Sequence, residues 1–240
     1  MSRIQMLNNV THKDLRIITK KSPEFGDNVA GALIFPEEFM DVQKEYPIFF
    51  QKDEETGEFQ AVAIFGFKQD ENLFLNEQGW QGYYIPAVIE REPFLIGFQA
   101  SATTDTDKEP VIHIDTQSPR ISKTDEGTAV FLPQGGNTAY IDNISKALLL
   151  IHEGLTANRA MFAEFLALDL LESFTLNIEF NNAEQYQATN YYTINQEKFF
   201  ALTDAPLANM HQRGYLHYGS MVISSLGNIK KLIARRNAML

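Results

Sequence analysis

His113 and Asp115 are the two residues whose types and spacing most directly suggest chemistry. They lie in VIHID (111–115), whose alternation of apolar and polar residues predicts a β-strand. Residues i and i+2 of a strand point to one face, so both side chains could reach the same metal ion. An HxD pair with a distant histidine is the ligand set of non-haem iron oxygenases. The pair therefore supports the hypothesis of an Fe²⁺ site.

A third ligand would have to come from a distant histidine. His152, His211 and His217 are the candidates, and the hypothetical ligand set takes His211 with His113 and Asp115. Arg120 would then be available to an acidic co-substrate. The competing interpretation is a half-buried histidine beside a solvent-facing aspartate with no metal. It is favoured, because a three-residue HxD pattern is common by chance.

An aromatic stretch is the second candidate site. Trp80, Tyr83, Tyr84 and Arg91 are residue types that line binding pockets and interfaces. The alternative is that they form the rim of an ordinary core. We take them as candidate ligand-binding residues for a peptide, an aromatic small molecule or a partner enzyme.

Several other kinds of chemistry are excluded or unsupported. The chain has no cysteine, which excludes disulfides, thiolate zinc sites and a Cys nucleophile. The loop PQGGNTAYI (133–141) lacks the Walker lysine, so it predicts a strand-to-helix turn capped by Asn137 or Thr138. No complete catalytic constellation is found. We therefore favour a non-catalytic binding protein without a cofactor over the metal-dependent, oxygenase-like enzyme.

Charge and hydropathy limit the partners. The net charge of −11, from 20 basic and 31 acidic residues, disfavours nucleic acid and anionic lipid. The longest uncharged run, 214–229, is too short and too polar to span a membrane. The N-terminal residues have no signal-peptide pattern. We expect a soluble protein in the cytoplasm.

The strands that must position these residues are read from apolar alternation and turn residues. A hairpin is predicted over 47–53 and 59–67, turning at Thr56 and Gly57, and a second over 174–180 and 185–194. Further strands are expected over 30–35, 73–76, 111–115 and 128–133.

Helices dominate the second half of the predicted fold. They are expected over 36–46, 83–94, 138–171 with a break at Gly154, 195–202, 205–213 and 220–236. The sequence thus predicts an α+β fold, with mostly antiparallel sheet in the N-terminal half and packed helices mainly from the C-terminal half. We expect one domain over 1–240, strand-rich in 1–135 and helix-rich in 136–240.

Eight segments in order resemble a known family. They are LNNVTHKDLRI (7–17), YPIFFQKD (46–53), FGFKQDENLFL (65–75), WQGYYIPAVIEREPFLIGF (80–98), HIDTQSPRIS (113–122), FLPQGGNTAYI (131–141), IHEGL (151–155) and YTINQEKFFAL (192–202). Their order and spacing resemble the SapC family of proteobacterial proteins over essentially the whole chain.

The resemblance implies a biological role but no catalytic mechanism. The family name implies resistance to antimicrobial peptides and peptide transport, although a permease role conflicts with the lack of a span. Neighbouring receptor and flavin-dependent halogenase genes imply uptake or modification of a small molecule, with a halogenase as a candidate partner. The resemblance brings no catalytic residues with it. A homodimer stays an open alternative.

Overall fold

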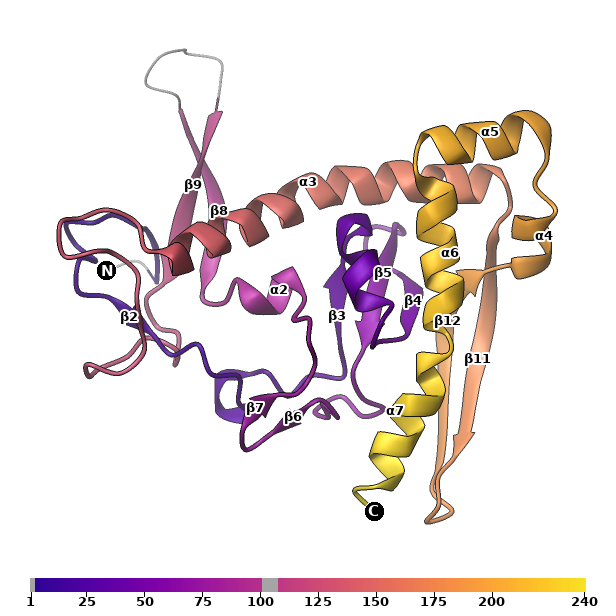
Figure 1. Cartoon of the computed structure of the whole chain (residues 1–240), viewed down its shortest axis with the longest axis horizontal. Coiled ribbons are helices and arrows are strands. Elements are labelled where there is room, and N and C mark those ends of the chain that lie inside the picture. Colours follow the sequence, from indigo (N-terminus) through magenta and orange to yellow (C-terminus); the bar gives the residue numbers. More distant parts are fainter. Residues whose placement is uncertain (1–2, 101–107) are drawn as a thin grey trace. The chain divides into compact units, whose positions relative to one another are not determined.

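The computed structural model describes residues 3–100 and 108–240, and the chain divides into two compact units (Figure 1). Unit 1 consists of Met1–Asp27 and Ala87–His152, and unit 2 of Asn28–Pro86 and Glu153–Leu240. Helix makes up 34% and strand 27%, with antiparallel sheets mostly in the N-terminal half, so the predicted α+β class is confirmed. The expectation that 1–240 behaves as one domain stays a prediction.

Unit 1 is built on a three-stranded antiparallel sheet in the order β1-β9-β8. Its strands are β1 (Ile4–Met6), β8 (Phe94–Ala100) and β9 (Lys108–Asp115), and a second pair joins β2 (Arg16–Ile17) to β10 (Thr128–Ala129). The unit also holds η1 (Pro23–Phe25), α2 (Ala87–Glu90) and the first part of α3 (Ala139–Ala167). Ile141, Ile144 and Leu148 recur at helical spacing on α3, and they join the apolar core of this unit.

Unit 2 is built on a five-stranded antiparallel sheet in the order β11-β12-β4-β5-β3. The strands are β3 (Gly31–Ile34), β4 (Ile48–Lys52), β5 (Phe59–Ile64), β11 (Leu171–Glu179) and β12 (Gln185–Ile194), with β6 (Leu75–Asn76) and β7 (Gly79–Trp80) as a separate pair. Both predicted hairpins, β4–β5 and β11–β12, are confirmed.

The helices of unit 2 pack on this sheet and around it. They are η2 (Pro36–Glu38), α1 (Phe39–Val42), the last part of α3, α4 (Gln196–Phe200), α5 (Asp204–Gln212), α6 (Tyr215–Ser225) and α7 (Asn228–Asn237). Phe50 of β4 meets Phe162 and Phe165 of α3 with ring centroids 4.8 and 6.3 Å apart, which fixes the helix on one face of the sheet. Among the described residues, no helix is long and apolar enough to cross a membrane.

Two predicted helix boundaries were wrong. We expected Gly154 to break the helix over 138–171, but α3 runs through it without interruption. A Cβ at Gly154 would overlap the Phe35 ring, so glycine is needed there for close packing and not as a helix end. Conversely, the expected helix over 220–236 is two helices, because α6 ends at Ser225 and α7 begins at Asn228.

Other segments are shorter than predicted. The helix expected over 83–94 is only α2, one turn between the two prolines. The helix expected over 36–46 is a 3₁₀ turn followed by α1, and the strand expected over 128–133 is only β10. The predicted cap of α4 is confirmed, since the Asn195 side chain accepts a hydrogen bond from the Lys198 backbone.

Candidate functional site

The aromatic loop, which we define as residues 80–86 of unit 2, is fixed through the hydroxyl of Tyr46. The Trp80 Nε1–H donates to the Tyr46 hydroxyl oxygen at 2.9 Å, and that hydroxyl donates to the Tyr84 carbonyl at 2.7 Å. Tyr46 is completely buried, and its ring packs edge-on against Phe65 and Phe74. One hydroxyl therefore ties the loop to the core of this unit at two points, Trp80 and Tyr84.

Burial also fixes the protonation state of this hydroxyl. Removal from water raises the pKa of Tyr46 well above its ordinary value, with a smaller opposing contribution from the Trp80 hydrogen bond. An ordinary tyrosine is already protonated at neutral pH, and the raised pKa lets this hydroxyl keep donating to Tyr84 at higher pH as well.

A second anchor holds the far side of the aromatic loop. The Tyr84 hydroxyl donates to Glu38 Oε1 at 2.8 Å, while the Phe35 backbone N–H donates to Glu38 Oε2 at 2.9 Å. Both carboxylate oxygens of Glu38 thus accept a hydrogen bond. Glu38 is only 1% exposed, and a buried carboxylate without hydrogen-bond partners would be costly. Tyr84, which we predicted as a ligand-binding residue, is half-buried, and its hydroxyl holds the loop in place.

Tyr83 differs from its neighbours. Its side chain is 100% exposed, whereas its backbone N–H donates to Glu45 Oε2 at 2.7 Å. The preceding Gly82 lies so close to Tyr46 that a Cβ there would overlap the hydroxyl. The backbone under Tyr83 is thus held on both sides while its ring faces solvent.

The fourth predicted residue of this site lies in unit 1. Arg91 donates from Nη1 to the Phe94 carbonyl at 2.8 Å and forms an ion pair with Glu92 at 3.1 Å. Its assignment to a ligand site stays a prediction. Sequence reasoning also missed Tyr46 and Glu38. The only signal for Tyr46 was general, since a buried tyrosine usually needs a partner for its hydroxyl.

The hypothetical metal ligands do not form a group that could hold a metal ion in the part of the chain that the structure describes. In unit 1, the ring of His113 lies against Gly97, where a Cβ would overlap it. Asp115 accepts from Arg3 Nε at 2.9 Å and from Nη2 at 2.6 Å. His211 lies on α5 of unit 2. Within residues 3–100 and 108–240, no group of three His, Asp or Glu could hold a metal ion. The Fe²⁺ hypothesis therefore has no ligand set to support it.

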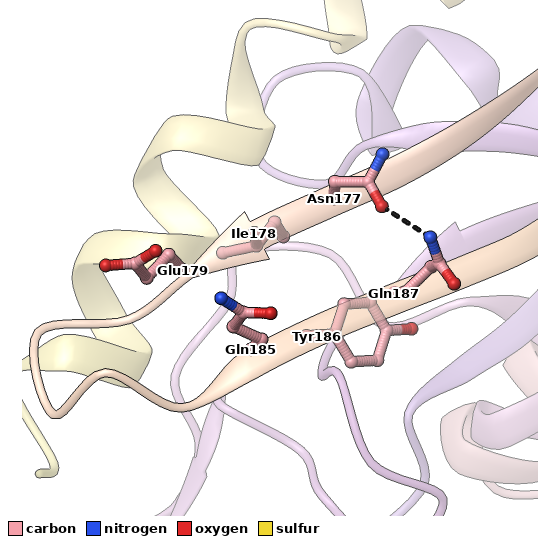
Figure 2. Close-up of a pocket in the computed structure, with 6 residues that line it drawn as sticks. All are labelled: Asn177, Ile178, Glu179, Gln185, Tyr186 and Gln187. Atoms are coloured by element: carbon pink, nitrogen blue, oxygen red, sulfur yellow. Dashed lines mark hydrogen bonds between the residues drawn. The ribbon is translucent and has the colours of Figure 1, made fainter.

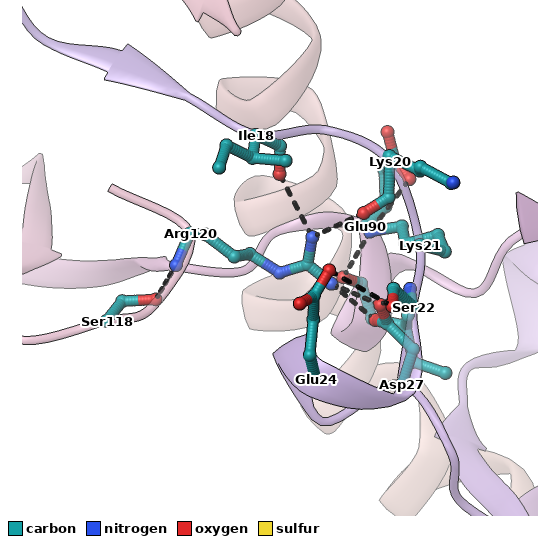
Figure 3. Close-up of polar contacts among 10 residues, drawn as sticks. Ile18, Lys20, Lys21, Ser22, Glu24, Asp27, Glu90, Ser118 and Arg120 are labelled. Atoms are coloured by element: carbon teal, nitrogen blue, oxygen red, sulfur yellow. Dashed lines mark hydrogen bonds and ion pairs between the residues drawn. The ribbon is translucent and has the colours of Figure 1, made fainter. Parts of the chain in front are cut away.

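Arg120 was expected to be available to a co-substrate, and this was wrong. It is 2% exposed and forms a buried ion pair with Asp27, which is 4% exposed (Figure 3). Its Nη1 donates to the carbonyls of Ile18 and Lys20, both at 3.1 Å. A guanidinium committed to these acceptors ties the segment after β2 to the loop after β9, and it is not free for a substrate.

The pairing of Asp115 gives a titration that can be tested. The hydrogen bond from Arg3 holds the pKa of Asp115 below its usual 3.8. Because the folded-state pKa is lowered, the pair stabilises the fold above pH 3.8, and this contribution is lost as the pH falls through the lowered pKa. We expect Arg3→Ala to raise the Asp115 pKa in an NMR-detected titration. Arg91→Ala should leave it unchanged, and an unshifted pKa in Arg3→Ala would contradict the contact.

The fold and the site together define an α+β protein in two compact units, with a fixed loop that presents one exposed tyrosine. A family model described as SapC matches residues 7–232 of the 240-residue chain. The chain belongs to the SapC family. Comparison with curated proteins and with solved structures gave no match.

Proposed function

We propose that this protein is a non-catalytic binding protein that engages a polypeptide partner through Tyr83 on the aromatic loop. The observation that supports the proposal is the contrast between a wholly exposed ring and a backbone anchored to buried groups. Tyrosine offers a large, rigid contact surface with one polar tip, and it is enriched among residues that dominate interface energies.

The anchoring favours binding for a physical reason. A flexible loop loses conformational freedom when it binds, whereas a loop already held by Tyr46 and Glu38 loses little. The two anchors satisfy every buried polar group they involve, so they stabilise one loop conformation. We infer that the sequence keeps the aromatic loop ready for contact.

A polypeptide fits this surface better than a small molecule does. Small-molecule sites are concave and bury most of their ligand. A side chain that is 100% exposed lines no such concavity, but it can enter a pocket on a partner protein. Of the partners considered from the sequence, a partner enzyme such as a halogenase, or a peptide, is therefore favoured over a free aromatic compound.

The biological setting is part of the same proposal. Membership of the SapC family supports a role linked to antimicrobial-peptide resistance, or to uptake and modification of a peptide or small molecule. In that setting the protein would act as an accessory that presents or holds the polypeptide, and the chemistry would reside in the partner.

Truncation of the exposed ring tests the proposal. We expect Tyr83→Ala to fold normally and to deplete at least one captured polypeptide about tenfold, since a hot-spot truncation costs upward of ~1–2 kcal/mol. The measurement is quantitative mass spectrometry after affinity capture from extracts of the source cells. Phe200→Ala is the matched control, because Phe200 is another exposed ring at 71%. Equal capture by Tyr83→Ala and the wild type would contradict the role of Tyr83.

A further inference from the structure

β11 is the end strand of the five-stranded sheet, with β12 as its neighbour on one side (Figure 1). It has 9 residues, whereas typical strands have about five or six. We propose that this edge docks an extended, basic segment of a partner polypeptide as an additional strand. The site is independent of the aromatic loop and of the function proposed for Tyr83.

The register shows which backbone groups are free for such a strand. The Phe180 N–H donates to the Glu184 carbonyl at 2.9 Å, and the Asn195 N–H donates to the Leu170 carbonyl at 2.8 Å. These two bonds place hydrogen-bonded positions at even-numbered residues at both ends of β11. Such positions alternate along a regular antiparallel strand, so the backbone N–H and C=O groups of even-numbered β11 residues point toward β12. The N–H and C=O groups that point outward then belong to Leu171, Ser173, Thr175, Asn177 and Glu179.

The edge has little of the usual protection. Natural edge strands are shielded by lysine, proline, a β-bulge, a short length or a covering element. The register shift between Phe174 and Leu176 places its extra residue on β12, so β11 itself stays regular. β11 reads LESFTLNIE, with no lysine and no proline, and Ser173, Thr175, Asn177 and Glu179 are all exposed. An unshielded run of outward backbone groups is the feature that proteins use to bind peptides by strand addition.

The charge of the β11–β12 hairpin indicates which kind of polypeptide segment can pair with the edge. The hairpin over 171–194 has no Lys or Arg, and it contains Glu172, Glu179 and Glu184. Glu184 is already paired with Lys68 and Arg236, so Glu172 and Glu179 carry the negative charge along the edge. A second copy would bring two acidic edges together, and like charges across an interface are unfavourable. A segment that carries lysine or arginine gains attraction at the same positions. We therefore assign the edge to a basic partner segment and not to a homodimer.

A hollow over the β11–β12 hairpin offers places for basic side chains that reach across β11 from the edge. It has a volume of about 380 Å³ and is lined in part by Asn177, Glu179, Gln185 and Gln187 (Figure 2). Asn177 Oδ1 accepts from Gln187 Nε2 at 2.8 Å, which orients both amides across the two strands. Carboxylate and amide oxygens along this face are suitable acceptors for an ammonium group.

The test uses a labelled peptide of about ten residues in which lysine alternates with threonine and valine. We expect saturable binding in fluorescence polarisation, weakened by salt. Asn177→Pro removes an outward N–H and leaves the ladder to β12 intact, so it should raise the Kd about tenfold. Asn177→Ala keeps that N–H and should stay within about twofold of the wild type.

Several outcomes would overturn the proposal. These are equal affinity for Asn177→Pro, equal binding of a peptide N-methylated at alternate residues, or equal binding of a glutamate analogue. A dimer in sedimentation that Asn177→Pro dissociates would assign the edge to a second copy instead. If Asn177→Pro does not fold by circular dichroism, the N-methylated peptide against the wild-type chain decides the question. Phe200→Ala should bind the lysine peptide like the wild type, and the edge is tested with other variants and another readout than Tyr83, so failure of either proposal is distinguishable.

Discussion

Arg120→Ala is expected to lower the free energy of unfolding by about 3–5 kcal/mol, because it leaves the buried Asp27 carboxylate without its partner charge. Asp27 would keep the hydrogen bond from the Ser22 backbone N–H, at 2.7 Å, but would lose its ion pair with the guanidinium. The carbonyls of Ile18 and Lys20 would also lose their donor. Urea denaturation followed by circular dichroism measures the change.

The control for this prediction is an arginine at the surface of the same unit. Arg3 pairs with Asp115 but is 65% exposed, so Arg3→Ala should lower the free energy of unfolding far less than Arg120→Ala does. Replacing Arg120 and Asp27 together by apolar residues of similar volume should recover much of the loss. Equal destabilisation by Arg120→Ala and Arg3→Ala would show that the buried pair does not hold this part of unit 1 together.

Phe50→Ala is expected to destabilise unit 2 by about 3–5 kcal/mol. Phe50 is 0% exposed and packs against Phe162 and Phe165 on α3, so truncation leaves a cavity between sheet and helix. Differential scanning calorimetry and denaturant titration both report the loss. Phe200→Ala, which removes a ring that is 71% exposed, should stay within about 0.5 kcal/mol of the wild type. If the two variants melt alike, α3 is not held on the sheet by this contact.

The two hairpins could be predicted from the sequence because their information is local. In β4–β5, Gly57 has a positive φ of 71°, and Asp53 Oδ1 accepts from the Thr56 N–H at 2.7 Å. Turn residues with these conformations stand next to the alternating strands they connect. The α+β fold class and the pairing of strands within each hairpin follow from such short-range patterns.

Helix boundaries failed where a distant residue decides the outcome. Gly154 has a helix-breaking propensity, yet α3 continues through it because the Phe35 ring occupies the space of a side chain. Phe35 lies far away in sequence, so no window around Gly154 contains that information. Packing against Phe35 therefore outweighs the low helix propensity of Gly154.

The residue types of the candidate site could be predicted from the sequence, but the positions of their side chains could not. Trp80, Tyr83 and Tyr84 stood out as a group, but only the structure separates the exposed Tyr83 from its anchored neighbours. Their partners Tyr46 and Glu38 precede them by 34 to 46 residues, and no sequence pattern pairs them. Burial of Arg120 was missed for the same reason, since Asp27 is 93 residues away.

Site-specific crosslinking tests most directly whether Tyr83 contacts a polypeptide. A photoreactive phenylalanine analogue would replace Tyr83 in one sample and Phe200 in the other, both of which are exposed rings. After illumination in source cells, the modified position 83 should give a discrete crosslinked polypeptide that position 200 does not give. The same products from both positions, or none from position 83, would contradict a binding role for the aromatic loop.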